Sequence, residues 1–460
     1  MPPPDEHRGG SDGLLNSEVR TFSYPNGEIQ RVQLVRLDSW QELTFHKPKI
    51  SAEAIDSFAR IYRKFLVPAC PVLFGTMVLF RLPEDIKIPF PYETARYGQV
   101  ADPLTAAAAA LEQGVYFLGK TPLFRNKQTR TFYRELERRN CIRIVRGWLP
   151  ITTIIPVGDL SGFLTESEEN ARMKVDASFF IMDRFDCATA QDHLGFPFGL
   201  RVKDGTVESP PAYGREALLV HQDGSIQIRP IDVRELELEI RGNRYRHGRN
   251  THIYDRPRCR VVRGPGKKVA ICGNTVASVS QSGSLVVPTS GFVMRVAEDC
   301  DIRPGDQVTY HGLSDVAFGV QVGNSILRNG VKTEKFLSRF YNIRHFQPVP
   351  YPPSLYPMNF KAGRAARIAL GADAAGKPML LWAEGAGKLR YTPGVDSCGA
   401  SLSEMAEICE AVGMVDAINL DGGGSAQILL NNNRSLQISD RQEEDNSECE
   451  RPIPMGLIVP

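Results

Sequence analysis

The segment VDAINLDGGGSAQILLNN, residues 415–432, determines the fold because it connects two strand-like runs through a turn with three consecutive glycines. The apolar residues before Asp421 and the run at residues 428–430 predict two β-strands. Glycines allow backbone amides to approach a ligand closely, and several N–H groups in one tight turn form a concavity that binds anions. A hairpin with Asp421 in an Asx turn explains the same residues. In the first interpretation, the phosphate-binding residues beside Asp421 are Gly422, Gly423, Gly424 and Ser425.

A second acidic residue stands in the segment MKVDASFFIMDRF, residues 173–185. Asp176 precedes two small residues and two aromatic residues, which can remove water from its carboxyl group. A partly buried carboxyl group has a raised pKa and can act as a general acid. The simpler alternative is that Asp176 caps a turn at the end of a strand.

A third segment, GRAARIALGADAAGKPMLLWAEG at residues 363–385, predicts a hairpin of two buried strands. Arg367 lies in the first strand among small apolar residues, and an inward-pointing guanidinium group needs an anionic partner. Arginine binds phosphate and carboxylate groups with two parallel hydrogen bonds. The partner of Arg367 is therefore either a ligand or a neighbouring acid such as Glu384.

The composition indicates a folded protein without an overall charge bias. The 460 residues are 42% hydrophobic and 23% charged, and 55 basic residues against 53 acidic ones leave a formal charge of +2. This balance argues against a nucleic-acid partner for the whole surface. One local stripe, residues 241–268, has ten Lys or Arg residues against the single acid Asp255, which fits either a nucleic-acid backbone or a solvated basic loop.

Other features bear on the compartment and on cofactors. The N-terminus has no apolar signal-peptide core, and the nine cysteines include no CxxC pair, so we expect a cytoplasmic protein without a disulfide framework or a zinc site. The apolar residues 65–80 are interrupted by Pro68, Pro71 and Gly75, so no membrane helix is expected. We expect no required cofactor, although a divalent cation remains possible, and the oligomeric state is not predicted.

The chain divides into three regions. Residues 1–30 are polar and predict a mobile tail. Residues 31–147 predict a small α/β region of unknown role, with helices near residues 52–66, 102–114 and 129–140. Residues 148–460 have short β-branched runs separated by Asp-Gly and Asn-Gly turns, and a helix begins at Ser401, where Glu404 completes a capping box. The fold class expected from this order is α+β, with a strand-rich mixed-sheet catalytic domain.

In order along residues 148–460, these segments resemble the phosphodiester glycosidase family. The glycine turn matches its NLDGGGS motif in full, and Arg367 begins a match to its RTAIG strand. Further matches lie at residues 176–180, 199–205, 217–228, 288–294, 323–332 and 399–406. The resemblance implies a glycosidase that acts on sugar phosphodiesters, with Asp421, Asp176 and Arg367 as catalytic residues. The implied substrate-binding residues are Ser178, Asn324, Glu384 and the four residues of the turn.

This chain differs from the family pattern at several of these positions. Asp176 replaces the family's asparagine, and Asn324 and Ser325 replace a glycine-proline pair. Alanines precede Arg367, where the family often has His-Pro, and the family's Asp-Gly-Arg corresponds to Glu384, Gly385 and Ala386.

The expected chemistry is cleavage of a glycosyl phosphodiester on the sugar side of the bridging oxygen, by hydrolysis or by transfer. A phosphate monoester leaves readily, because its second pKa is about 6. The site must then supply contacts for the phosphate and a carboxylate that stabilises the sugar cation or activates water. Two alternatives remain at this point. One is a metal-dependent phosphodiesterase that uses Asp421, Asp176, Asp183 and Asp186; the other is a catalytically silent carbohydrate- or nucleic-acid-binding protein.

Overall fold

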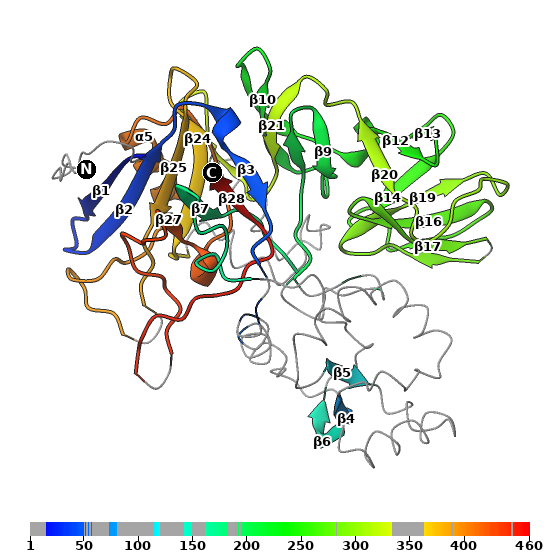
Figure 1. Ribbon diagram of the computed structural model, residues 1–460, viewed down its shortest axis with the longest axis horizontal. Helices are drawn as coiled ribbons and strands as arrows, with labels where there is room; N and C mark the ends of the chain where they lie inside the picture. Colours follow the sequence, from blue (N-terminus) through cyan, green and yellow to red (C-terminus); the bar gives the residue numbers. More distant parts are fainter. Residues whose placement is uncertain are drawn as a thin grey trace.

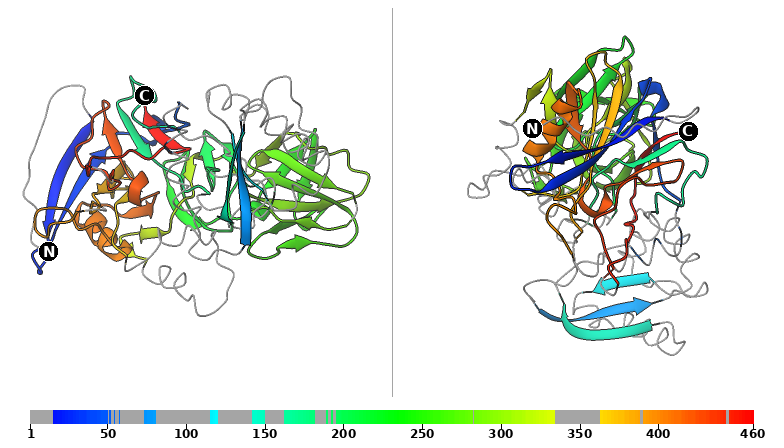
Figure 2. Two further views of the ribbon diagram at one scale, coloured as in Figure 1. Left: turned by 90° about the horizontal axis from the view of Figure 1, so that it is seen from below. Right: turned by 90° about the vertical axis from the view of Figure 1, so that its left-hand side faces the viewer.

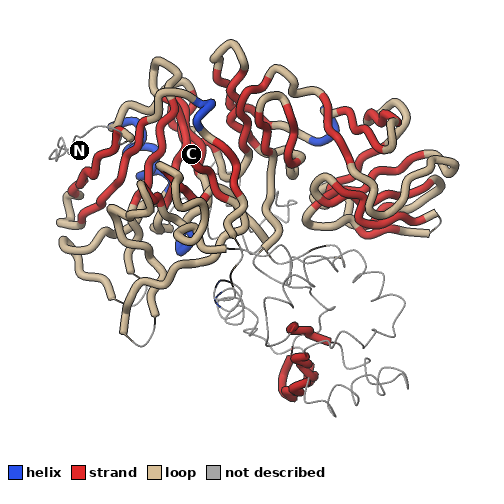
Figure 3. The backbone as a smooth tube through the Cα atoms, in the orientation of Figure 1, coloured by secondary structure: helices blue, strands red, loops and turns tan. Residues whose placement is uncertain are grey.

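The computed structural model describes residues 15–49, 162–181, 195–281, 283–333, 363–387, 390–442 and 445–460. It also describes the single residues 51, 54, 57, 189 and 192, and the backbone of three strands between residues 73 and 149. Strands predominate in the described part of the chain (Figure 3).

A seven-stranded sheet is the largest element, with its strands in the order β1-β2-β25-β24-β26-β22-β23 (Figure 1). Strands β24 and β25 form the predicted hairpin, and β26 pairs with β24. The bounds in spatial order are β1 (Asn16–Ser23), β2 (Ile29–Arg36), β25 (Pro378–Ala383), β24 (Arg367–Ala372), β26 (Asp416–Asn419), β22 (Ser325–Arg328) and β23 (Val331–Lys332).

A second sheet has four strands, in the order β27-β7-β28-β3. The glycine turn connects it to the seven-stranded sheet, because it joins β26 to β27. The turn contains the short 3-10 helix η6 (Gly423–Ser425), so β26 and β27 belong to different sheets and do not form a hairpin. The strands are β27 (Ile428–Leu430), β7 (Met173–Asp176), β28 (Gly456–Val459) and β3 (Thr44–His46). The turn therefore lies where the two sheets meet.

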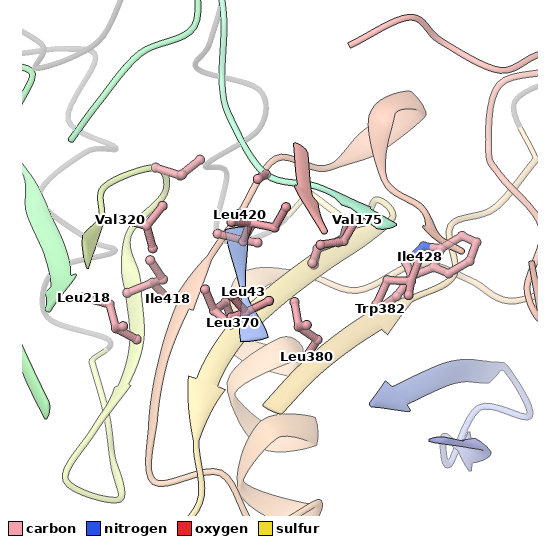
Figure 4. Packing of buried hydrophobic residues seen from close by; sticks show 14 of the residues in the cluster. Leu43, Val175, Leu218, Val320, Leu370, Leu380, Trp382, Ile418, Leu420 and Ile428 are labelled. Atoms are coloured by element: carbon pink, nitrogen blue, oxygen red, sulfur yellow. The ribbon is translucent and has the colours of Figure 1, made fainter. Parts of the chain in front are cut away.

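The main core fills the space between these sheets. Val175, Leu370, Trp382, Ile418 and Ile428 contribute to it from five strands, and all are inaccessible to solvent (Figure 4). The opposite face of the seven-stranded sheet packs against helix α5 (Leu402–Ala411) in a second cluster. A sheet covered on both faces requires strands that are apolar throughout, and β24 and β25 are buried at every position.

Helix α5 begins as the sequence predicts. The Ser401 hydroxyl oxygen accepts a hydrogen bond from the Glu404 amide at 3.2 Å, and the Glu404 carboxylate accepts one from the Ser401 amide at 2.8 Å. This reciprocal pair is a capping box, which satisfies two amides that the helix leaves without partners.

We expect Ser401→Ala to lower the free energy of unfolding by about 1 kcal/mol, because one helix amide loses its acceptor. Ser403→Ala is the matched control, since the Ser403 hydroxyl makes no hydrogen bond within the described residues. Urea denaturation monitored by tryptophan fluorescence measures both changes. Equal losses in the two variants would contradict the capping role.

The remaining strands of residues 195–333 form a second part of the molecule (Figure 1). A five-stranded sheet connects it to the main core, because Leu218 and Val220 point into the main core, while Ala217 and Leu219 point into a separate cluster. This sheet consists of β11 (Ile226–Pro230), β10 (Glu216–His221), β21 (Val316–Val320), β8 (Arg201–Lys203) and β9 (Thr206–Ser209).

Three smaller sheets lie beyond it, on the side away from β26 and β27 (Figures 1 and 2). They are the three-stranded sheet β13 (Asn243–Arg246), β12 (Glu237–Ile240) and β20 (Val308–His311); the four-stranded sheet β14 (His252–Asp255), β19 (Gly291–Val296), β16 (Lys267–Cys272) and β17 (Thr275–Ser280); and the pair β15 (Val261–Val262) and β18 (Leu285–Val286). The expected hairpin turns are present: Asp204 and Gly205 connect β8 to β9, both with positive φ.

The N-terminal residues differ from expectation. Residues 16–23, assigned to a mobile tail, form β1 and pair with β2 along its whole length, since Tyr24 to Glu28 make a tight connection. The expectation of a tail is therefore wrong for these residues. Strands β2 and β3 likewise belong to the two central sheets. After β3 the chain departs at Lys49 and returns at Gly162, whose Cα lies so close to the Lys49 carbonyl that a side chain would overlap it.

Within residues 50–161, the structure describes the antiparallel sheet β5 (Val115–Gly119), β4 (Leu73–Phe80) and β6 (Ile142–Leu149). Ala54 and Ser57 are helical, and the rest of the expected helix at 52–66 lies outside the described residues, as do the helices at 102–114 and 129–140. The strand-rich character with few helices is confirmed. Where we expected a mixed sheet, the paired strands are antiparallel throughout the described part.

Candidate functional site

The structure brings together the two carboxyl groups that the sequence singles out. Asp421 follows β26 at the start of the glycine turn, and Asp176 is the last residue of β7. Both residues are inaccessible to solvent. A side-chain hydrogen bond couples the ionisation of the two groups, and the charge of Asp421 also raises the pKa of Asp176. The two sheets thus meet at a buried pair of carboxyl groups.

Burial raises the pKa of both groups. Removal from water is the main cause, and it raises the pKa of Asp421 to about 7. The pKa of Asp176 lies well above its ordinary value, because burial and the neighbouring charge of Asp421 act in the same direction. In Asp421, the Gly422 amide donates to Oδ1 at 2.7 Å and partly offsets the burial.

A single shared proton accounts for the geometry of the pair. If both groups are ionised, both oxygens of Asp176 and Oδ2 of Asp421 lack a donor within the described part of the chain. A proton on Asp176 supplies one, and two carboxyl groups at this proximity cannot both ionise near neutral pH. We therefore describe Asp176 and Asp421 as the carboxyl pair, with the proton on Asp176 and the charge on Asp421.

The cation that acts on the carboxyl pair is Arg451, a residue not expected from the sequence. Its positive charge lowers the pKa of both carboxyl groups and opposes the effect of burial. Arg451 also donates two hydrogen bonds to Oδ2 of Asp440, at 2.8 and 3.0 Å, in an ion pair that is almost fully buried.

The glycine turn is not an open phosphate cradle. The Gly422 amide donates to Asp421, and the Gly423 amide donates to the Ala366 carbonyl at 2.8 Å. The carboxylate of Asp440 lies against Gly424 so closely that any Cβ there would overlap it. Gly423 has a φ of +64°, which favours glycine. Two amides of the turn are thus bonded within the protein, and Gly424 admits the protein's own Asp440 to the turn; phosphate binding by the turn stays a prediction.

Arg367 also has a different position from the one we expected. Its guanidinium group donates to the backbone carbonyls of Ala400, at 3.1 Å, and Gly363, at 2.9 Å, and the side chain is buried. The Ala400 carbonyl directly precedes the N-cap of helix α5, and Gly363 lies shortly before β24, so Arg367 ties the start of the helix to the start of β24. Its expected role as a phosphate clamp is not supported by these contacts, and Glu384 is not its partner.

The remaining predicted substrate-binding residues are buried or engaged. The Ser178 hydroxyl donates to backbone carbonyls at 3.1 and 3.2 Å. Asn324 accepts a hydrogen bond from buried Arg215 at 3.1 Å, and its amide nitrogen lacks an acceptor among the described residues. The Ser425 hydroxyl is buried and contributes to lowering the pKa of Asp421.

Glu384 lines a polar cavity at the end of the β24–β25 hairpin. One of its oxygens accepts hydrogen bonds from Ser397 and from Arg31 at 3.3 Å, and the other accepts from the Gln437 amide at 2.8 Å. The cavity is also lined by Gly385, Gly387, Arg390, Asp396, Arg441 and Asn446. The cavity adjoins the glycine turn, because Gly385 lies against Ser439, whose hydroxyl donates to the Gly423 carbonyl at 3.1 Å.

The basic stripe at residues 241–268 lies in the outer sheets and not beside the turn (Figure 1). Nearby acids neutralise part of it: Arg241 pairs with Asp301, Arg244 with Glu237, and Arg258 with Asp232. Of the two interpretations of this stripe, these ion pairs favour a solvated basic loop over a surface that binds a nucleic-acid backbone.

The described residues contain no group of three His, Cys, Asp or Glu side chains arranged to hold a metal ion. Asp183 and Asp186, which the metal hypothesis requires, lie outside the described residues. No helix in the described ranges is long and apolar enough to cross a membrane.

Sequence reasoning missed Asp440 and Arg451, the buried ion pair that adjoins the turn. Asp440 stands in the acidic, polar stretch SDRQEED, which resembles a solvated loop. One signal pointed to Asp440: a triple glycine implies that another group approaches the backbone closely.

Comparison with known proteins identifies a family for half of the chain. The sequence profile of the phosphodiester glycosidase family matches residues 234–460, which include Asp421 but not Asp176. This match confirms the resemblance over residues 234–460.

Individual relatives are more distant. The N-acetylglucosamine-1-phosphodiester alpha-N-acetylglucosaminidases of Mus musculus and Homo sapiens are each 37% identical over 95 residues, 21% of this chain. The matched stretch spans only 17% of each relative. The solved structure of the zebrafish enzyme's catalytic domain, auto-inhibited by its pro-peptide, aligns with a TM-score of 0.37 and 12% identity over 99% of this chain and 87% of that one. A hypothetical protein from Synechocystis aligns with a TM-score of 0.41 and 13% identity, covering all of this chain and 64% of the other.

Proposed function

From the match of residues 234–460 to the phosphodiester glycosidase family, we propose that this protein hydrolyses a glycosyl phosphodiester. The bond that breaks is the one between the anomeric carbon and the bridging oxygen. Water supplies the new hydroxyl group of the sugar, and the phosphate monoester leaves with the bridging oxygen.

The observation that carries this proposal is the carboxyl pair. Asp421 and Asp176 stand at two motif positions that resemble the family, far apart in the sequence, and the fold places them in contact. The hydrogen bond between them divides the roles, because it raises the pKa of Asp176 and lowers that of Asp421, so that Asp176 is the proton donor of the pair and Asp421 is the group that carries the charge.

In this proposal the Asp421 carboxylate stabilises the positive charge that develops on the sugar or activates the attacking water. Protonated Asp176 holds Asp421 in place through their hydrogen bond, donates its proton and takes one back as the reaction proceeds. The leaving phosphate needs little protonation. Carboxyl groups in direct contact act as one unit, so their spacing does not distinguish inversion from retention as it does for two groups on opposite sides of a sugar. Because both groups are buried, catalysis requires a rearrangement that admits the substrate.

Hydrolysis in oxygen-18 water tests where the bond breaks. With the substrate UDP-N-acetylglucosamine and with a simple alkyl ester of N-acetylglucosamine 1-phosphate, we expect the label in the sugar hydroxyl and none in the phosphate product. Mass spectrometry of both products measures it. Label in the phosphate would show attack at phosphorus and would overturn the glycosidase assignment in favour of a phosphodiesterase.

A further inference from the structure

We propose that the polar cavity beside Glu384, which we call the arginine cavity, binds the phosphate-bearing part of a sugar phosphate. This inference rests on the proposed function only in taking that ligand to be part of the substrate. The cavity is defined by Arg31, Glu384, Arg390, Asp396, Arg441 and Asn446.

The first observation is a buried donor without an acceptor. The Arg441 side chain is only 8% exposed, and its Nη1 atom makes no hydrogen bond within the described part of the chain. Its Nη2 atom donates to the Gln437 side chain at 2.7 Å, and the nearest carboxylate, that of Glu448, is 3.6 Å away from Nη1. A buried guanidinium nitrogen is costly without an acceptor, so this atom is suited to a ligand oxygen.

The second observation is a buried acceptor in the same cavity. Asn446 Oδ1 is buried and receives no hydrogen bond from any described residue. Asn446 has a φ of +61°, a conformation that asparagine tolerates better than most residues, so the side chain is held at a fixed turn. A bare anion cannot satisfy an acceptor, whereas a sugar phosphate offers both phosphate oxygens for Arg441 and hydroxyl groups for Asn446.

The charges around the cavity favour an anion. The three arginines face two acids, and both acids are already engaged by the protein: Glu384 by Ser397, Arg31 and the Gln437 amide, and Asp396 by the Thr392 amide at 2.7 Å. Arg390 is exposed at the rim. The residues that line the cavity therefore carry one excess positive charge, which Glu448 outside the lining partly offsets, and the free donors come from arginine, which suits phosphate geometry.

The position of the cavity connects it to the carboxyl pair. Gln437 and Arg441 line the cavity, while Ser439 and Asp440, between them in sequence, contact the glycine turn. One short segment thus has the cavity on one side and the turn on the other. A ligand anchored in the cavity lies one segment away from Asp421, so this site supplies phosphate contacts next to the turn.

Calorimetric titration of the full chain with glucose 1-phosphate, inorganic phosphate and methyl glucoside tests this assignment. We expect glucose 1-phosphate to bind most tightly, and Arg441→Gln to weaken it by about ten- to hundredfold, the effect of losing charged hydrogen bonds. Arg390→Gln, at an exposed position that cannot disturb the core, should weaken it several-fold. The matched control is Arg303→Gln, an exposed arginine in the outer part of the molecule.

The outcomes separate this inference from the proposed function. Equal affinity in Arg441→Gln, Arg390→Gln and Arg303→Gln would overturn the arginine cavity as a sugar phosphate site, whether or not the protein hydrolyses phosphodiesters. If the protein hydrolyses them, Arg441→Gln should raise KM with little change in kcat, and an unchanged KM would also overturn it. If the protein bound glucose 1-phosphate through Arg441 but did not hydrolyse phosphodiesters, the assignment of the arginine cavity would stand and only the proposed reaction would be wrong.

Discussion

Asp421→Asn is expected to lower kcat by at least about a hundredfold while the protein stays folded. Asparagine keeps the size of the side chain and can still accept the hydrogen bond from the Gly422 amide, so the turn should keep its shape. What disappears is the negative charge that the proposed reaction needs, and positioned acid-base groups contribute about a hundredfold or more. Hydrolysis of N-acetylglucosamine 1-phosphate esters at saturating substrate measures the change.

The same variant should change how stability depends on pH. The pKa of Asp421 is about 7 in the folded protein and near 4 in the unfolded chain, so between these values the folded state binds more protons. Wild-type stability must then fall as pH rises from about 4 to about 7, by at most about 1.4 kcal/mol per pH unit for this group. Asp421→Asn removes the contribution of this group, while buried Asp176 keeps its own, so the dependence should become weaker and the variant should be at least as stable as the wild type at pH 7.

Asp416→Asn is the control for both measurements. Asp416 lies in the same strand β26, but its carboxylate accepts a hydrogen bond from the Asn329 amide near the surface. This variant should keep its activity and its pH dependence of stability. If Asp421→Asn retained near-normal turnover and lost thermal stability, Asp421 would be a structural turn residue and not part of an active site.

Arg451→Met is expected to cost about 3–5 kcal/mol of unfolding free energy, because it leaves the Asp440 carboxylate buried against Gly424 without its cation. The double variant Arg451→Met/Asp440→Asn should recover most of this loss, since no uncompensated charge remains. Urea denaturation at pH 7 measures all three proteins.

An exposed ion pair provides the comparison. Arg229 and Glu235 are 2.8 Å apart and both are well exposed, so Arg229→Met should cost less than about 1 kcal/mol. If Arg451→Met proved equally mild, the Asp440–Arg451 pair would not be what keeps the turn in place. If the double variant were as unstable as Arg451→Met alone, the loss of stability would come from the missing packing of the arginine side chain and not from the buried charge of Asp440.

The sequence located the two carboxyl groups of the pair better than it located their surroundings. Periodicity and turn chemistry located β24, β25, β26 and helix α5, because these depend on neighbours within a few residues. Asp176 and Asp421 could be selected because a motif marks each of them. The contact of Asp440 with Gly424 could not be predicted, since it joins a loop residue to a turn through the tertiary fold.

The glycine turn shows why the sequence did not predict what surrounds Asp421. Three glycines indicate that something approaches the backbone closely, and this inference was right. Composition does not indicate whether the approaching group is a ligand or a side chain of the same protein. Here the anion that approaches Gly424 is a carboxylate with its own arginine. Likewise, polar residues 16–23 resembled a tail because the β1 strand is an edge strand, exposed on one side.

The contact between Gly162 and Lys49 bears on the modular construction of the chain. The two sheets that hold the carboxyl pair take strands from both sides of residues 50–161, and the chain departs and returns at a single point. These residues are thus an insertion within a discontinuous domain. Insertions whose ends touch impose little strain on their host, so segments of quite different length can occupy this position without altering the geometry of Asp176 and Asp421.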